Sequence, residues 1–133
     1  MSTKEMAYSI IDSMSEQEIQ AFVYRSLSPA QIKNIHKVSS FSNLKKGWNG
    51  YDAKPISTTL VEMVKEALVS LSTYQPEVFP TGRNSIQLEY EKENGDYLEF
   101  EIFEDGKVSM YLSKGNEEVE KLITAKIPLE KIE

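Results

Sequence analysis

The spacing of apolar residues changes once along the chain, and this change constrains the fold more than any other feature. Up to residue 71, apolar residues recur every three or four positions, which is typical of amphipathic helices. From residue 86 they alternate with polar residues, which is typical of strands with one face in water. The chain is therefore predicted to be an α+β protein, in which N-terminal helices precede an antiparallel β-meander packed on a helix.

Three alternating stretches predict three strands within residues 86–112. Asn94 and Gly95 are expected to form a two-residue turn with positive φ at both positions, and Asp105 and Gly106 mark a second turn. Residues 115–133 are left open between a helix and a fourth strand, and residues 74–83 are interpreted as a connection. The face predicted to be buried consists of Ile86, Leu88, Tyr90, Leu98, Phe100, Ile102, Val108, Met110 and Leu112.

The helical half contains recognisable start signals. Ser15 and Glu18 have the spacing of a capping box inside a predicted helical hairpin over residues 4–27. Ser28 before Pro29 predicts another helix start, because proline at the first helical position loses no hydrogen bond. Ser57 is the expected cap of a further helix that would cover the sheet.

Length and composition favour one soluble domain. The chain has 133 residues, so we predict a single domain 1–133 with residues 1–27 as an association arm, which allows a homodimer, and residues 44–133 as the core. No stretch is apolar and long enough to span a membrane, and the N-terminus does not resemble a secretory signal. The lack of cysteine excludes disulfides and favours the cytoplasm.

Charge is distributed unevenly along the chain. Residues 19–51 contain no acid but five cations, whereas residues 77–105 contain nine acids and only two cations. The solvent face of the predicted sheet collects Glu89, Glu91, Glu99 and Glu101, which we interpret as charges that face a basic protein partner. Two alternatives remain for these carboxylates: they provide solubility, or they act in metal-assisted hydrolysis. The basic stretch over residues 25–46 is interpreted either as a solvated helical face or as a site of phosphate contact. The net charge of −6 disfavours direct nucleic-acid binding.

No catalytic constellation is found in the sequence. His36 is the single histidine and has no cysteine with which to hold zinc. No nucleophile elbow and no glycine-rich phosphate loop occurs. We therefore expect neither an enzyme nor a bound cofactor.

The segment between the predicted helices contains two large aromatic residues, Trp48 and Tyr51. They either pin this segment onto the core or act as exposed anchors for a partner. The surrounding string G-W-N-G-Y-D-A-K-P-I-S, residues 47–57, resembles the G-W-[DN]-G-Y-x-A-x-P-[IV]-S motif of small uncharacterised bacterial and phage proteins. The hairpin over residues 4–27 is similar to those of antitoxin-like and mobile-element proteins, where such hairpins mediate association.

These observations lead to one main hypothesis and two alternatives. The main hypothesis is a non-catalytic, acidic, protein-binding regulator or inhibitor of the antitoxin, immunity or anti-defence type, which includes anti-CRISPR proteins. Its expected partner-binding residues are Glu89, Glu91, Glu99, Glu101, Trp48 and Tyr51. The alternatives are a metal-assisted hydrolase that uses strand carboxylates, and a self-associating structural subunit.

Overall fold

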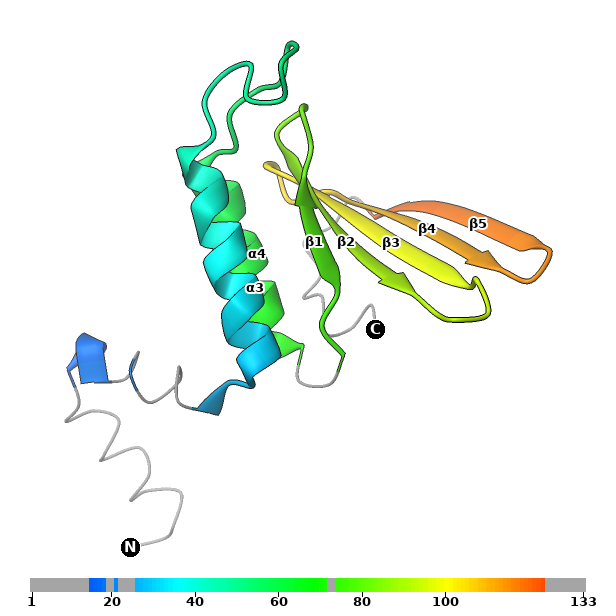
Figure 1. The fold of residues 1–133 in the computed structure, drawn as a ribbon, viewed down its shortest axis with the longest axis horizontal. Helices are drawn as coiled ribbons and strands as arrows, with labels where there is room; N and C mark the ends of the chain where they lie inside the picture. The colour runs from blue at the N-terminus through cyan, green and yellow to red at the C-terminus, as the bar shows by residue number, and fades with distance from the viewer. Residues whose placement is uncertain (1–14, 19–20, 22–25, 72–73, 124–133) are drawn as a thin grey trace, which may run out of the picture.

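The computed structural model describes residues 15–18, 21, 26–71 and 74–123, whose principal elements form a helical layer and a sheet (Figure 1). Helices α3 (Pro29–Ser40) and α4 (Thr58–Ser70) lie side by side, and the short 3₁₀ helix η1 (Phe41–Asn43) follows α3. The sheet contains β1 (Glu77–Pro80), β2 (Ser85–Glu91), β3 (Tyr97–Phe103), β4 (Val108–Lys114) and β5 (Glu117–Ile123). All neighbours are antiparallel, and the order of the strands in the sheet is their order in the chain.

The α+β class is confirmed, but the prediction of three or four strands is wrong because the sheet has five. β1 lies in the segment interpreted as a connection, where prolines at positions 76 and 80 disguise a strand. Proline is tolerated here because β1 is at the edge of the sheet, where a missing N–H breaks no ladder. Val78 of β1 pairs with Leu88 and is fully buried.

β5 resolves the open choice for residues 117–123 in favour of a strand, which pairs with β4 from Glu117 to Ile123. The turn between β2 and β3 is longer than predicted, because Glu91 pairs with Tyr97 and the Lys92 amide donates to the Asp96 carbonyl. Of the predicted turn pair, only Gly95 has a positive φ, at 92°.

The predicted start signals are confirmed where the structure describes them. The Glu18 amide donates to Ser15 Oγ at 3.2 Å, and the Gln31 amide donates to Ser28 Oγ at 3.1 Å. The Leu60 amide donates to Ser57 Oγ at 3.2 Å and so begins α4. Most of the hairpin predicted over residues 4–27, and the last ten residues of the chain, lie outside the described residues.

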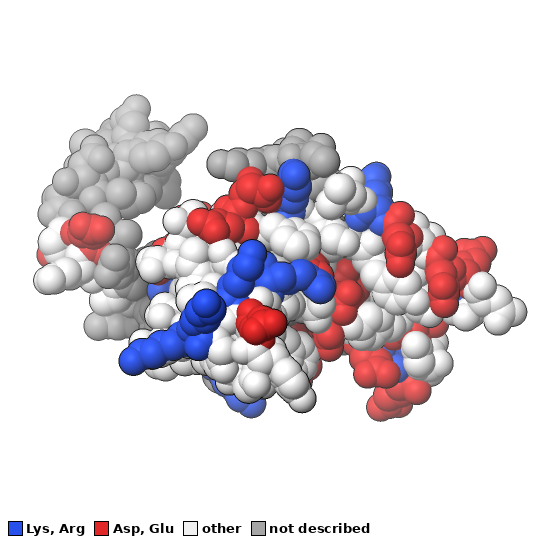
Figure 2. All heavy atoms as spheres, turned by 90° about the horizontal axis from the view of Figure 1, so that it is seen from above, with Lys and Arg blue, Asp and Glu red and all other residues white. Residues whose placement is uncertain are grey.

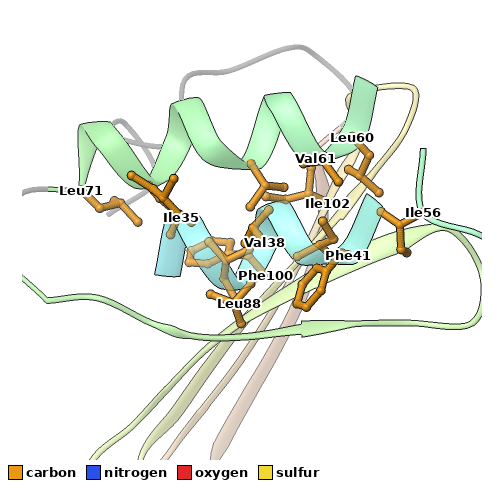
Figure 3. Packing of buried hydrophobic residues seen from close by; sticks show 14 of the residues in the cluster. Ile35, Val38, Phe41, Ile56, Leu60, Val61, Leu71, Leu88, Phe100 and Ile102 are labelled. Atoms are coloured by element: carbon orange, nitrogen blue, oxygen red, sulfur yellow. The ribbon is translucent and has the colours of Figure 1, made fainter. Parts of the chain in front are cut away.

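The core lies between the two helices and the inner face of the sheet (Figure 3). Five of the nine residues predicted for the inner face are buried, and Tyr90, Leu98, Met110 and Leu112 are partly buried. Both helices contribute, and their side chains point toward one another and toward β2 and β3. The buried helical residues are Ile35, Val38, Leu60, Val61, Val64 and Leu68.

Among the described helices, none has the length and apolar character needed to cross a bilayer.

One buried side chain joins the two helices. Gln31 in the first turn of α3 is 5% exposed, and its Nε2 donates to the carbonyls of Leu68 (3.1 Å), Val69 (3.2 Å) and Leu71 (3.0 Å). These carbonyls lie at the C-terminal end of α4, where intrahelical partners run out. Gln31 Oε1 meanwhile accepts from the Ser28 amide at 2.9 Å. The Gln31 side chain therefore hydrogen-bonds to backbone groups at the start of α3 and at the end of α4.

We predict that Gln31→Met lowers the free energy of unfolding by about 2 kcal/mol, because methionine fills similar space but removes the Nε2 donor from the Leu68 and Val69 carbonyls. The Leu71 carbonyl keeps a second donor, Gln75 Nε2. Urea denaturation measures the change. Lys33→Met on the exposed side of the same helix is the matched control and should leave stability nearly unchanged. Equal stability of the two variants would show that the Gln31 bonds do not hold α4.

Candidate partner-binding surface

The outer face of the sheet, which points away from the helices, is acidic. Because side chains alternate along a strand, the register places every second strand residue on this face. No described strand position on it is a lysine or an arginine. We call this surface the acidic face, and its carboxylates belong to Glu77, Glu89, Glu91, Glu99, Glu101, Glu118 and Glu120.

Three of these glutamates form a row across neighbouring strands. Glu77 of β1 pairs with Glu89 of β2, which pairs in turn with Glu99 of β3. The row continues through Tyr111 of β4 to Glu120 of β5. Like charges directly opposite each other are destabilising. The row therefore lowers the stability of the folded chain.

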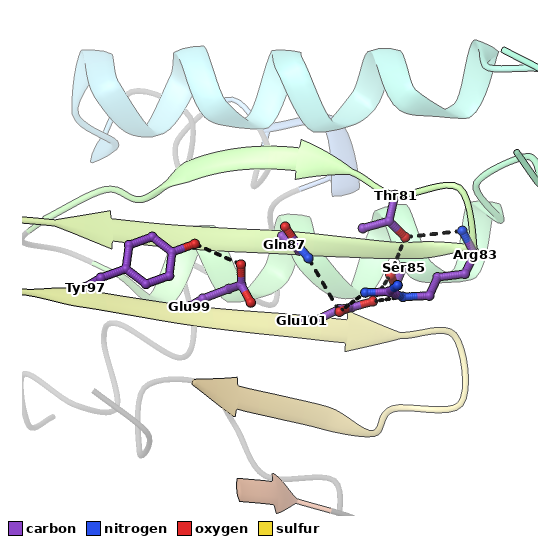
Figure 4. A network of polar contacts seen from close by, with 7 residues as sticks. All are labelled: Thr81, Arg83, Ser85, Gln87, Tyr97, Glu99 and Glu101. Carbon is purple, nitrogen blue, oxygen red and sulfur yellow. Dashed lines mark hydrogen bonds and ion pairs between the residues drawn. The ribbon is translucent and has the colours of Figure 1, made fainter. Parts of the chain in front are cut away.

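Two tyrosines lie among the glutamates. The rings of Tyr97 and Tyr111 have their centroids 6.1 Å apart and are tilted by 55°. The Tyr97 hydroxyl donates to Glu99 Oε1 at 2.8 Å (Figure 4). Burial, followed by the hydrogen bond to Glu99 and by the nearby negative charge of Glu89, raises the pKa of the Tyr97 phenol far above its ordinary value. The phenol therefore stays protonated and acts as a hydrogen-bond donor on this face.

Glu101 differs from the other predicted partner-facing residues, because it is only 7% exposed. Arg83 Nε and Nη2 each donate to it at 2.6 Å, and the Ser85 hydroxyl donates to the same carboxylate (Figure 4). Burial favours the neutral acid, but the hydrogen bonds from Arg83 and Ser85 outweigh it and lower the pKa of Glu101. The solvent-facing position predicted for Glu101 is therefore corrected: its charge is paired inside the protein.

Trp48 and Tyr51 lie in the loop between η1 and α4 and have different surroundings. Trp48 is partly buried, and its Nε1 donates to the Lys54 carbonyl at 2.9 Å, so it closes the loop. Tyr51 is 83% exposed. Each of the two predicted roles therefore fits one residue of the pair. Trp48 pins the loop, and Tyr51 has the exposure that an anchor for a partner needs.

Residues that sequence reasoning missed hold this loop against the sheet. The Lys54 amide donates to the Gly82 carbonyl at 2.8 Å, and the Ser57 amide donates to Asn84 Oδ1 at 2.9 Å. We call these two bonds the clasp. Asn84 has a positive φ of 56°, which asparagine adopts more readily than most residues. A glycine and an asparagine two residues apart were the available turn signal, but they do not name a distant partner.

The charges near the loop are mainly positive. Lys45, Lys46 and Lys54 are exposed, and Asp52 is the acid among them. Seen from the end that carries the loop, basic side chains gather toward the viewer and acidic ones toward the β4–β5 edge at the right (Figure 2). The predicted partner-binding residues thus divide between the acidic face and a basic loop at the end of the sheet.

Among the described residues, no group of three or more histidines, cysteines or carboxylates is arranged to hold a metal ion. No family model, curated protein or solved structure is similar enough to this chain to count as a match. The motif resemblance of residues 47–57 therefore stays a prediction.

We predict that Arg83→Ala destabilises the protein at neutral pH by about 1–2 kcal/mol, because it leaves a buried carboxylate without its guanidinium. The estimate is kept low because 63% of the Arg83 side chain is exposed and its charge is screened. The pKa of Glu101 is lowered from 4.5, so the stability it contributes is present above pH 4.5 and is lost as pH falls through the lower, folded-state pKa.

Urea denaturation at neutral pH and on the acid side of pH 4.5 should therefore show the difference between wild type and Arg83→Ala shrinking with acidification. Arg83→Lys keeps the charge without the paired hydrogen bonds and should have intermediate stability. A difference that is constant with pH would mean that Glu101 ionisation plays no part.

We also predict that Glu89→Gln raises the free energy of unfolding by about 0.2–1 kcal/mol, because it removes two like-charged pairs while keeping the side-chain shape. Glu91→Gln is the control, since Glu91 lies opposite Tyr97 rather than a carboxylate. Thermal denaturation at two salt concentrations should show the gain at Glu89 and its decrease with salt. Equal effects at both positions would contradict repulsion within the row.

Proposed function

We propose that this chain is a non-catalytic regulator that binds a basic surface of another protein through its acidic face. The observation that carries the proposal is the row of Glu77, Glu89 and Glu99, which lie opposite one another on three neighbouring strands. Repulsion within such a row lowers the stability of the free protein. A cationic partner relieves that repulsion, so its binding gains free energy that a sheet with paired charges does not offer.

The tyrosines support the same kind of partner. Lysine and arginine side chains pack favourably on aromatic rings. Tyr97 and Tyr111 provide two such rings between the glutamates of β2, β3 and β5. Glu101 contributes indirectly, because its pairing with Arg83 fixes the turn that begins β2.

We assign the regulator to the antitoxin, immunity or anti-defence type, including anti-CRISPR proteins, and place it in the cytoplasm. The likeness of residues 47–57 to small bacterial and phage proteins supports this assignment. A carboxylate-rich face also suits an inhibitor that occupies the basic channel of a nucleic-acid-binding protein, because carboxylates there stand in for phosphates.

Capture of the partner by the tagged chain, from cells of the organism that encodes it, tests the proposal. The captured protein is purified and its affinity is measured at low and at physiological salt. We expect Glu89→Lys combined with Glu91→Lys to weaken binding at least tenfold, and wild-type affinity to fall as salt rises.

The matched control is Glu62→Lys combined with Glu66→Lys, which makes the same change of charge on the exposed side of α4. This control should bind like wild type. Equal loss in both double variants would indicate an effect of net charge alone, and unchanged binding in the first would exclude the acidic face.

A further inference from the structure

The loop that carries Tyr51 is rigidly built. The Gly47 amide donates to the Ala53 carbonyl at 2.8 Å, and the Gly50 amide donates to the Gly47 carbonyl at 2.9 Å. Asn49 Oδ1 accepts from the amides of Tyr51 (2.9 Å) and Ala53 (3.3 Å). Together with the Trp48 bond and the clasp, these contacts fix the loop in one conformation. A loop held in this way presents its side chains without a further loss of conformational entropy on binding.

Tyr51 takes no part in holding the loop by burial, since 83% of it is exposed. Ala53 beside it is 2% exposed and Ile56 is 4% exposed, so the loop buries its small and aliphatic residues and presents its tyrosine. Tyrosine offers large amphipathic contact area at low entropic cost and is enriched at binding hot spots. The same loop region carries exposed lysines at positions 45, 46 and 54, with Asp52 as the acid among them.

The acidic face has the complementary chemistry. It carries carboxylates without a lysine or an arginine on its described strand positions, and the Tyr97–Tyr111 pair lies among them. The loop cannot reach the middle of this face in its own molecule, because the clasp ties it to the turn before β2. Glu89 lies five residues beyond Asn84, which corresponds to about 16 Å along an extended strand.

We infer that the Tyr51 loop of one copy docks onto the acidic face of a second copy, so that the chain associates head to tail. Such an interface joins two different patches and leaves one of each free, so it extends to further copies or closes into a ring. The net charge of −6 disfavours a nucleic acid, and it also acts between two copies, so docking of a second copy rests on the local contact between the lysines of the loop and the carboxylates of the acidic face. The inference goes beyond the proposed function, although both use the acidic face.

Sedimentation velocity of the full chain over a range of concentrations, at low and at physiological salt, provides the test. The loop variant is Tyr51→Ala with Lys54→Glu, both at exposed positions, and the face variant is Glu89→Lys with Glu91→Lys. Wild type should grow with concentration beyond its smallest species. Each variant alone should associate at least tenfold more weakly.

Mixing the two variants is the decisive step. Each keeps the surface that the other has lost, so an equimolar mixture should form a complex of one copy of each and grow no further. Lys33→Glu and Glu66→Lys, which change charge elsewhere, should assemble like wild type. Circular dichroism confirms that every variant is folded.

Three outcomes would overturn the inference: no growth of the wild type, growth of the loop variant equal to wild type, or no complex in the mixture. Binding of a short single-stranded oligonucleotide that depends on Tyr51 would also overturn it, because the loop would then serve a nucleic acid. The loop variant keeps the acidic face intact, so its capture of a basic partner distinguishes failure here from failure of the proposed function.

Discussion

Helix α4 is fixed at both ends by side-chain amides from other elements, and much of the structure depends on this. Asn84 from the sheet side accepts the amide at its start, and Gln31 from α3 donates to the carbonyls at its end. Between these ends, its apolar residues complete the core over the inner face. The same start holds the preceding loop against the Gly82 turn, so the exposure of Tyr51 follows from how the helix begins.

The sheet combines opposite demands on its two faces. The inner face of β1, β2 and β3 packs against the helices, which requires apolar residues, and the outer face collects carboxylates whose mutual repulsion has a stability cost. A sequence selected for stability alone would alternate charges across this row. This cost agrees with the proposed function, because carboxylates suited to a basic partner repel one another in the free protein.

The sequence predicts those parts of the fold that are determined by neighbouring residues, such as helix caps and alternating strands. The inner face, the caps at Ser28 and Ser57, and the three strands β2, β3 and β4 follow from periodicity and capping chemistry, whereas the pattern leaves open the choice between helix and strand for residues 117–123. β1 was not predicted because prolines normally argue against a strand. They are tolerated at the edge of a sheet, and the edge position is known only once the sheet is assembled. The burial of Glu101 was missed because Arg83 lies 18 residues away in a turn. Nothing in the spacing of Trp48 and Tyr51 distinguishes which ring closes the loop and which faces water.

Trp48 is the single tryptophan of the chain, and its indole closes the loop through the Lys54 carbonyl. Intrinsic fluorescence excited at the indole therefore originates at one known place, beside the clasp and three residues from Tyr51. The emission reports the local state of the loop rather than an average over the molecule. A change in this emission therefore reports local opening of the loop while the core stays folded, without an added label. It also reports the binding of any molecule that changes the solvation of the loop.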